Sequence, residues 1–224
     1  MGFSVPGEVL MTKILIVDDH AVIRDGLAVL INDESDLEVC GEAADVVDAL
    51  QAISETDPDV AIIDVSLETG SGIELVKEVK ARFPNVRMLV WSMFDESLYA
   101  ERAIKAGALG YIDKKNVRDN IIDAIRTVLE GSVYLSAEYS SKVINRLRRG
   151  ESVEAKLPTE VLTDRELEAY TLIGNGLNTA EIAERMELTV STVETYRSRI
   201  KEKLELRNAS QLIREATVWV LSNG

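Results

Sequence analysis

The stretch KILIVDD, residues 13–19, decides the fold because it joins an uninterrupted apolar run to a pair of acids. An apolar run without alternation is typical of a strand buried on both faces of a parallel sheet. Further strand-like runs lie at about 37–43, 59–64, 86–91 and 109–112, and helical patterns lie near 20–32, 45–55, 72–82, 96–106 and 117–130. Five strand–helix repeats predict an α/β domain, a doubly wound, flavodoxin-like, five-stranded parallel sheet with helices on both faces.

Polar side chains stand where four of these strands end. They are Asp18 and Asp19 after the first strand, Asp64 at the end of VAIID, Ser92 after RMLVW, and Lys114 within GYIDKK. An acid pair after a strand is often only a turn and a helix cap, so the joint pattern carries the argument. Because the carboxyl ends of parallel strands meet at one edge, we expect the five side chains to converge. Three carboxylates, a hydroxyl and an ammonium describe a magnesium-assisted phosphoryl acceptor.

Length and charge predict two different halves. The chain has 224 residues, which fits two domains, and a net charge of −14. Residues 1–135 hold 12 Lys and Arg against 25 Asp and Glu, whereas residues 136–224 hold 13 against 14. The acidic whole argues against indiscriminate binding of nucleic acid. The second half escapes that objection, since residues 195–207 carry a local basic excess.

Targeting signals are not apparent in this sequence. The single cysteine, Cys40, predicts no internal disulfide, and no apolar stretch approaches the roughly 18 residues that span a bilayer. The first ten residues lack a secretory pattern, and Met11 is a candidate natural start. We therefore expect a soluble cytoplasmic protein with no membrane partner.

The pattern of strand-end residues resembles the receiver domain of bacterial two-component response regulators, over residues 11–132. The resemblance implies that Asp64 accepts a phosphoryl group from a sensor histidine kinase, and that the chain is an acceptor with at most slow autodephosphorylation rather than an enzyme. It implies a Mg²⁺ ion held by Asp18, Asp19, Asp64 and the backbone oxygen of Ser66. It also implies that Lys114 and Ser92 contact the phosphoryl group and that Tyr111 acts as a switch.

Four positions depart from the usual receiver pattern. Leu67 and Glu68 stand where Met-Pro is common, so the loop loses a rigid turn former. Lys115 follows Lys114 where proline is usual, and the spacing after Gly110 favours Lys114 as the functional lysine. Phe94 replaces a residue that is often polar, and we expect its bulk to slow loss of the acyl phosphate.

Residues 162–204 hold a second signal, LTDRELEAYTLIGNGLNTAEIAERMELTVSTVETYRSRIKEKL. Thr163 and Glu166 have the spacing of a capping box, and two short helices with a tight turn between them suit helix-turn-helix docking. This part resembles the LuxR-type DNA-binding domain over residues 158–224. A linker at 133–157, which contains a short amphipathic helix, separates it from the receiver-like part.

The third helix of this second domain predicts a surface that enters the major groove of double-stranded DNA. At about 100° per residue, one face carries apolar residues and the opposite face carries short polar ones. Residues predicted to face the bases are Ser191, Glu194, Thr195 and Ser198. Residues predicted to contact phosphates from the flanks are Arg197, Arg199, Lys201 and Lys203. The last helix leaves two possibilities open for Leu212, Ala216, Trp219 and Val220, a dimer contact or packing within their own domain.

The two resemblances together identify the chain as similar to NarL/FixJ-type response regulators. They imply a transcription factor that forms a homodimer when Asp64 is phosphorylated. An aspartate-dependent phosphatase is the second class considered, but it expects two acids separated by one residue, whereas Asp18 and Asp19 are adjacent. The remaining alternative is a phospho-regulated protein-interaction regulator with weak or no DNA binding, which the net acidity and Ser191 favour weakly.

Overall fold

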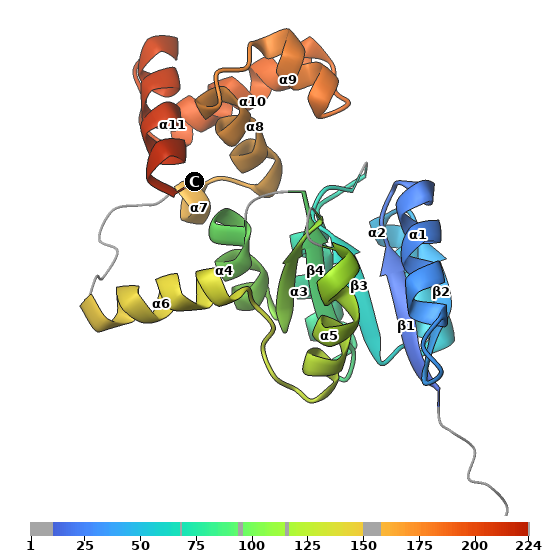
Figure 1. Ribbon diagram of the computed structural model, residues 1–224. Helices are drawn as coiled ribbons and strands as arrows, with labels where there is room; N and C mark the ends of the chain where they lie inside the picture. Colours follow the sequence, from blue (N-terminus) through green and yellow to red (C-terminus); the bar gives the residue numbers. More distant parts are fainter. Residues whose placement is uncertain (1–10, 68, 94–95, 115–116, 150–157, 224) are drawn as a thin grey trace, which may run out of the picture.

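The structure is a computed structural model, and it describes residues 11–67, 69–93, 96–114, 117–149 and 158–223. Within these ranges an α/β half is followed by an all-helical half (Figure 1). Residues 1–10, which precede the candidate start at Met11, and residues 150–157, the last part of the predicted linker, lie outside the described residues.

The first half is built on a five-stranded sheet whose pairings are all parallel, in the order β2-β1-β3-β4-β5. Its strands are β1 (Thr12–Val17), β2 (Leu37–Ala43), β3 (Val60–Asp64), β4 (Arg87–Ser92) and β5 (Gly110–Asp113). The chain order reverses between β1 and β3, where ligands bind in doubly wound sheets. Strand type and position agree with the sequence prediction within one residue.

Helices cover both faces of the sheet because each central strand is apolar on both faces. Ile14 and Ile16 pack in one cluster with α1 (Ala21–Asn32) and α5 (Val117–Leu129). Leu15 and Val17 point the other way, into a cluster with the other three helices of this half. These are α2 (Val46–Thr56), α3 (Gly72–Arg82) and α4 (Glu96–Ala106). The period-two alternation of side chains along β1 therefore supplies both cores.

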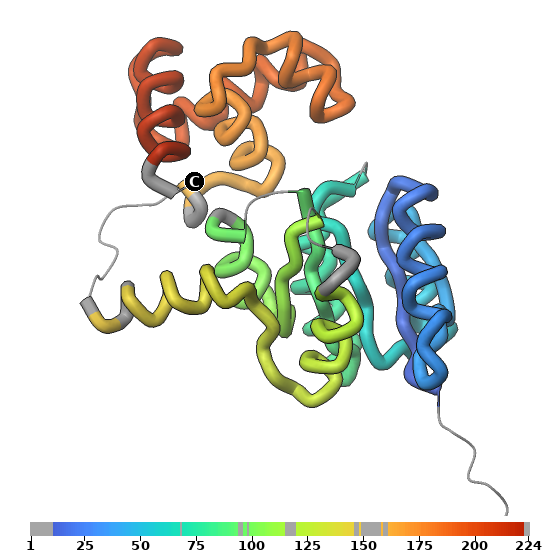
Figure 2. Tube along the Cα trace, in the orientation of Figure 1, coloured from blue at the N-terminus to red at the C-terminus, as the bar shows by residue number. Residues whose placement is uncertain are grey.

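The helical half follows a further helix, α6 (Ala137–Arg149), which extends away from the sheet (Figure 1). Its helices are α7 (Pro158–Val161), α8 (Asp164–Gly174), α9 (Thr179–Arg185), α10 (Val190–Lys203) and α11 (Ala209–Asn223). The capping box that the sequence predicts at Thr163 and Glu166 is present, and Asn178 and Glu181 form a second one. Helices α7 and α4 are in contact. The trace in Figure 2 shows the helical half lying above the α/β half in this view.

Helix α11 packs on α8, and this decides between the two possibilities for its apolar residues. Leu212 and Ala216 are completely buried, and the ring of Trp219 lies 5.5 Å from that of Tyr170 in α8. A Cβ atom at Gly174 would come within 2.5 Å of the Ala216 carbonyl oxygen, so the helices cross where α8 lacks a side chain. These buried residues serve their own domain. The exposed apolar side chains of α11 are different ones, Ile213, Val218 and Leu221.

Among the described residues, no helix has both the length and the apolar character that spanning a membrane requires.

Candidate functional site

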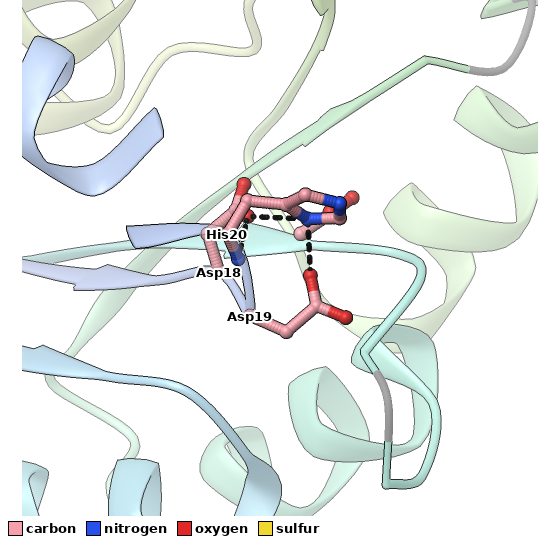
Figure 3. Close-up of side chains that lie close together, drawn as sticks. Asp18, Asp19 and His20 are labelled. Atoms are coloured by element: carbon pink, nitrogen blue, oxygen red, sulfur yellow. Dashed lines mark hydrogen bonds and ion pairs between the residues drawn. The ribbon is translucent and has the colours of Figure 1, made fainter. Parts of the chain in front are cut away.

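The acids predicted at the strand ends meet at the carboxyl edge of the sheet. Asp18 and Asp19 follow β1, Asp64 ends β3, and each offers a carboxylate oxygen within 4.8 Å of the others and of a ring nitrogen of His20. Figure 3 shows three of these residues side by side in the turn after β1. Asp18 and Asp64 are almost completely buried, whereas Asp19 is partly exposed. The geometry confirms the predicted convergence of the three carboxylates.

Lys114 binds two of the three acids at once. Its Nζ atom lies 2.7 Å from Oδ2 of Asp18 and 2.5 Å from Oδ2 of Asp64. The same atom lies 4.8 Å from the centre of the Trp91 ring, so an aromatic face supports the ammonium from a third side. The structure thus places Lys114 at the acid cluster. Lys115 lies outside the described residues.

The environment of Asp64 raises the pKa of its carboxyl group to about 6. Burial is the largest cause, because it penalises the charged form, and the neighbouring carboxylate of Asp18 acts in the same direction. Lys114 and the backbone N–H of Ser66 oppose the rise. Three carboxylates and one ammonium group give the cluster a net charge of two negatives when all four are ionised, and this charge favours a divalent cation.

The donor set fits a magnesium ion. Carboxylate oxygens are the ligands that Mg²⁺ prefers, and oxygens no more than 4.8 Å apart can close on an octahedral ion with small rotations. The buried Oδ1 atom of Asp19 faces the His20 ring, whose Nδ1 atom lies 2.6 Å from it. The side-chain oxygen of Ser66 is also buried without a hydrogen-bond partner among those residues. The site is therefore a candidate metal centre.

A close backbone contact fixes the loop that follows Asp64. Gly72, the first residue of α3, donates its N–H to the Val65 carbonyl at 3.0 Å. A Cβ atom at position 72 would come within 1.8 Å of the Asp64 carbonyl oxygen. Ser71 precedes it and caps α3 by accepting a hydrogen bond from the Glu74 N–H. Strand β3 and helix α3 thus meet where only glycine fits.

The other predicted site residues lie in or beside this edge. Ser92 ends β4 completely buried, opposite Asp113 of β5 in the sheet register. The ring of Tyr111 is buried between the sheet and the α4 side, so the structure shows only an inward position for the predicted switch. Glu68 and Phe94 lie outside the described residues, and the expectation about acyl phosphate loss stays a prediction.

Two neighbours of the cluster were not predicted as site residues. His20 sits at the start of α1, and its Nδ1 atom lies 2.6 Å from Asp19. Burial lowers the pKa of His20, but the charges of Asp19 and Asp18 outweigh this effect and leave the pKa raised. The sequence predicts Trp91 only as a residue of a strand. Trp91 stands one position before Ser92, at the end of β4 that lies at the same sheet edge as the acids. That position in the sequence could have indicated a contact with Lys114.

The polar stripe predicted on α10 is exposed. Val193 and Ile200 are buried, while Ser191, Glu194, Thr195 and Ser198 face solvent. Glu194 accepts a hydrogen bond from Thr179 of α9 at 2.9 Å, and Arg197 lies 3.8 Å from its carboxylate. The stripe is therefore available to a ligand and is held in place by α9.

The four flanking cations of α10 do not share one environment. Lys203 binds Glu166 of α8 at 2.6 Å, so its ammonium already has a partner within the domain. Arg199 is exposed, and Arg197 and Lys201 are half-buried. Arg199 is the flanking residue best placed for a phosphate contact.

Comparisons with known proteins agree with both halves. A family model described as the response regulator receiver domain matches residues 14–126, more than half of the chain. The chain belongs to the response regulators. A second model, described as bacterial regulatory proteins of the luxR family, matches residues 160–216 of this response regulator. Its helical half is therefore a LuxR-type DNA-binding domain.

Similar proteins cover nearly the whole response regulator. It is 36% identical over 209 residues to the oxygen regulatory protein NreC of Staphylococcus epidermidis, covering 91% of this chain and 96% of that one. NreC of Staphylococcus carnosus is 35% identical over 208 residues. These relatives show that this is a DNA-binding response regulator of a two-component system.

Solved structures show the same architecture. A LuxR-family two-component response regulator from Aurantimonas sp. matches 63% of this chain and 99% of its own length at 30% identity, with a TM-score of 0.58. RcsB from Salmonella enterica serovar Typhimurium, bound to a promoter in the presence of phosphomimetic BeF3⁻, matches 92% of this chain and 98% of its own, with a TM-score of 0.59. At 21% identity, the second likeness concerns the fold alone.

Proposed function

We propose that a sensor histidine kinase phosphorylates this response regulator on Asp64 and that the acyl phosphate controls its dimerisation and its action on transcription. One observation carries the proposal: Asp64 is almost completely buried, lies beside two further acids, and is bound by Lys114 at 2.5 Å. An acid at the end of a strand, with carboxylates and an ammonium group beside it, suits phosphoryl transfer. This reaction depends mainly on positioning and on charge neutralisation.

The transfer step follows from these groups. A carboxylate oxygen of Asp64 forms a bond to phosphorus while the bond from phosphorus to the imidazole nitrogen of the kinase's phosphohistidine breaks. The nitrogen keeps the electron pair, and Asp64 becomes a mixed anhydride. In this proposal Lys114 neutralises the charge that accumulates beside Asp64, and the hydroxyl of Ser92 donates a hydrogen bond to a phosphoryl oxygen. The chain thereby accepts a phosphoryl group without turning over a substrate as an enzyme does.

Magnesium is the proposed cofactor, held by Asp18, Asp19, Asp64 and the backbone oxygen of Ser66. The ion supplies positive charge that offsets repulsion between the carboxylate and the incoming phosphoryl group. The acid cluster supports this assignment, since its net charge of two negatives and its all-oxygen carboxylate donors match a small divalent ion.

Double-stranded DNA is the proposed partner of the exposed stripe on α10. Short hydroxyl side chains at 191, 195 and 198 can meet donor or acceptor edges of bases in the major groove. Dimers of helix-turn-helix proteins bind two half-sites, so we propose a homodimer as the DNA-binding form. The RcsB dimers that were solved bound to two parallel DNAs, a fold-level likeness with a TM-score of 0.56, are consistent with this form. Such a regulator acts in the cytoplasm, where kinase and DNA meet.

Phosphorylation with a small donor tests the proposal. Wild type incubated with Mg²⁺ and acetyl phosphate is expected to gain the mass of one phosphoryl group, to dimerise and to retain genomic DNA fragments at a stated salt concentration. Asp64→Asn, which keeps the shape of the side chain, is expected to lose all three responses. A phosphorylated protein that dimerises but retains no DNA at any salt concentration would favour the protein-interaction alternative.

A further inference from the structure

Trp91 lies in the same row of the sheet as the proposed acceptor. Side chains along β4 alternate between the two faces, so Val90 packs in the core of the α3 and α4 side and Trp91 in the core of the α1 and α5 side. In the sheet register Trp91 pairs with Asp64 of β3 and with Ile112 of β5. Because Ile62 packs on the α1 side, the same alternation along β3 places Asp64 on that face. The indole ring therefore stands beside the acceptor.

Lys114 reaches this place from the end of β5. Its Nζ atom lies 2.5 Å from Oδ2 of Asp64 and 4.8 Å from the centre of the Trp91 ring. The second distance is within the roughly 6 Å at which the face of an aromatic ring attracts a cation. The lysine side chain is only 7% exposed and Trp91 only 2%, so water screens little of this attraction.

The indole N–H of Trp91 gains nothing from its position. It is buried and has no hydrogen-bond partner among the described residues. Burying an unpaired N–H costs free energy, and phenylalanine at this position would avoid that cost. Of the aromatic side chains, however, tryptophan has the face that attracts a cation most strongly. The ring face, rather than the N–H group, is thus what the indole contributes here.

An open space beside the ring gives the ammonium group room to leave. A cavity of about 510 Å³ is lined by Trp91, Lys114 and Met93 and by apolar residues of α1. Met93 and Val22, which line it, are largely exposed, so the cavity opens to solvent. The flexible four-carbon stem of lysine can swing into such a space. The ring face and the carboxylates together limit that motion.

We propose that Trp91 is a positioning residue for phosphoryl transfer, because the face of its ring keeps the ammonium group of Lys114 over Asp64. The inference rests on the proposed function, which makes Asp64 the acceptor and Lys114 the group that neutralises the incoming charge. Trp91 acts through Lys114 in this role. Since phosphoryl transfer depends on positioning and charge neutralisation, a lysine that moves away slows the transfer step rather than the binding of the donor.

The test weakens the ring face while it changes the size of the ring little. Trp219→Phe in the full chain leaves Trp91 as the only tryptophan, and this protein is produced with tryptophan or with mono-, di- and trifluorotryptophan. Each fluorine withdraws electrons from the ring face and weakens its attraction for a cation. Phosphorylation with Mg²⁺ is followed by intact mass over a range of acetyl phosphate concentrations, and circular dichroism checks that each form is folded.

The logarithm of the rate at saturating acetyl phosphate is expected to fall in proportion to the number of fluorines, by about fivefold in total. The concentration of acetyl phosphate that gives half of the maximal rate is expected to stay within about twofold, because the donor does not bind through the ring. A side chain that only fills space would leave the rate unchanged along the series.

Trp91→Phe and Trp91→Leu separate the ring face from its bulk. Both variants remove the indole N–H and leave space behind, but only phenylalanine keeps an aromatic face. The rate is expected to stay within about threefold of wild type for Trp91→Phe and to fall about tenfold for Trp91→Leu.

Phe83→Leu is the matched control, because it removes another ring that lies against a cation. The guanidinium carbon of Arg82 is 5.3 Å from the centre of the Phe83 ring, at the end of α3 far from Gly72. This variant is expected to be phosphorylated at the rate of wild type. A similar loss in Phe83→Leu and Trp91→Leu would overturn the inference, as would equal losses in Trp91→Phe and Trp91→Leu.

The two proposals fail in different ways. If Asp64 gains a phosphoryl group at a rate that is the same for every fluorinated form, the inference alone fails. If Asp64 of the wild type gains none from acetyl phosphate, the proposed function fails and the inference with it.

Discussion

At the scale of single residues, Lys114 decides whether the acids of the site can remain charged together. It bridges Asp18 and Asp64 in surroundings that exclude water, and its own side chain is only 7% exposed. A buried ion cluster loses more when one partner is removed than the pair contributes as a whole, because the remaining charges are left uncompensated.

Lys114→Met is therefore expected to destabilise the receiver by about 3 kcal/mol or more, measured by urea unfolding at neutral pH. Added Mg²⁺ is expected to restore part of the loss, because it supplies the missing positive charge. Lys77→Met, which removes a cation from an exposed pair with Glu74, should change stability by less than about 0.5 kcal/mol. Equal losses in both variants would contradict the assigned role of Lys114.

The main residues of the site could be predicted from the sequence because the path of the backbone alone determines where each strand ends. Asp18, Asp64, Ser92 and Lys114 come together once the parallel sheet is granted, and no side-chain geometry is needed. The contact between Lys114 and Trp91 depends on rotamers that no sequence pattern fixes. The pairing of Lys203 with Glu166 escaped prediction for the same reason, since it joins two helices whose crossing was unknown.

At the scale of elements, the junction of β3 and α3 is the tightest described contact beside the site. Gly72→Ala places a methyl group against the Asp64 backbone and is expected to cost several kcal/mol, because the main chain must move. It should also reduce phosphorylation by acetyl phosphate, followed by intact mass.

Gly26→Ala is the matched control for that substitution. Gly26 lies inside α1, where a Cβ atom would have nothing within 4 Å, so alanine is expected to stabilise the protein by about 0.5–1 kcal/mol. Thermal unfolding of the two variants should therefore move in opposite directions. A neutral Gly72→Ala would show that the strand–helix junction is looser than the backbone contact indicates.

The start of α8 is held by a carboxylate whose charge stabilises the fold. Burial alone would raise the pKa of Glu166, but hydrogen bonds from Lys203 and from Thr163 outweigh it and leave the pKa lowered. A lowered pKa in the folded state means that the stabilisation is present above the ordinary glutamate pKa and is lost as the pH falls through the folded value.

Glu166→Gln is therefore expected to cost about 1 kcal/mol at pH 7 and progressively less below about pH 4.5. Urea unfolding across this range, with Glu181→Gln as the control at the exposed capping box of α9, measures the difference. A cost that stays constant with pH would show that shape, rather than charge, holds the cap.

Two cations of α10 allow a contact with DNA to be distinguished from a contribution to stability. Arg199 is exposed, whereas Lys203 is paired with Glu166. Arg199→Met is expected to weaken DNA binding and to lower the slope of log affinity against log salt by about one, because one phosphate contact is lost. Lys203→Met is expected to leave the slope unchanged and to lower stability by leaving Glu166 unpaired. Measuring the DNA affinity of both variants at four salt concentrations, on one genomic fragment that the wild type retains, distinguishes the two roles. A lower slope in Lys203→Met would indicate that its pair with Glu166 opens on DNA.

At the scale of the whole molecule, one apolar cluster runs through both halves of the chain. It joins buried residues of the sheet and of α3 and α4 to Leu162, Leu167 and the helices behind them. Together with the contact of Arg102 with Asp164, this continuity predicts that the two domains unfold together.

Calorimetry is expected to show one transition for the wild type and two for Arg102→Met, because loss of a partner from a buried ion pair costs about 3–5 kcal/mol and falls on the contact between the domains. Lys105→Met, which removes a cation that pairs with Glu101 on the same helix, is expected to keep the single transition. Two well-separated transitions in the wild type would show that the domains are thermodynamically independent.

Domain arrangement is the level that the sequence did not predict. The fold of each half follows from local signals in the sequence: the spacing of apolar residues, the helix caps and the glycines that end helices. Docking depends on the pair of Arg102 with Asp164 and on Arg165, which donates a hydrogen bond to the backbone carbonyl of Leu67. These residues look like ordinary surface charges until the two domains are placed together. Their burial is a property of the assembled chain and leaves no local pattern.

The contact that Arg165 makes has a consequence for how this protein can diverge. The arginine recognises a main-chain carbonyl at position 67, and every amino acid supplies that oxygen. Mutations that alter the side chain there can accumulate over generations without erasing the hydrogen bond, provided that the loop keeps its path. A receiver transplanted from a distant homologue would still offer the same acceptor atom, so chimeric regulators have a ready point of attachment.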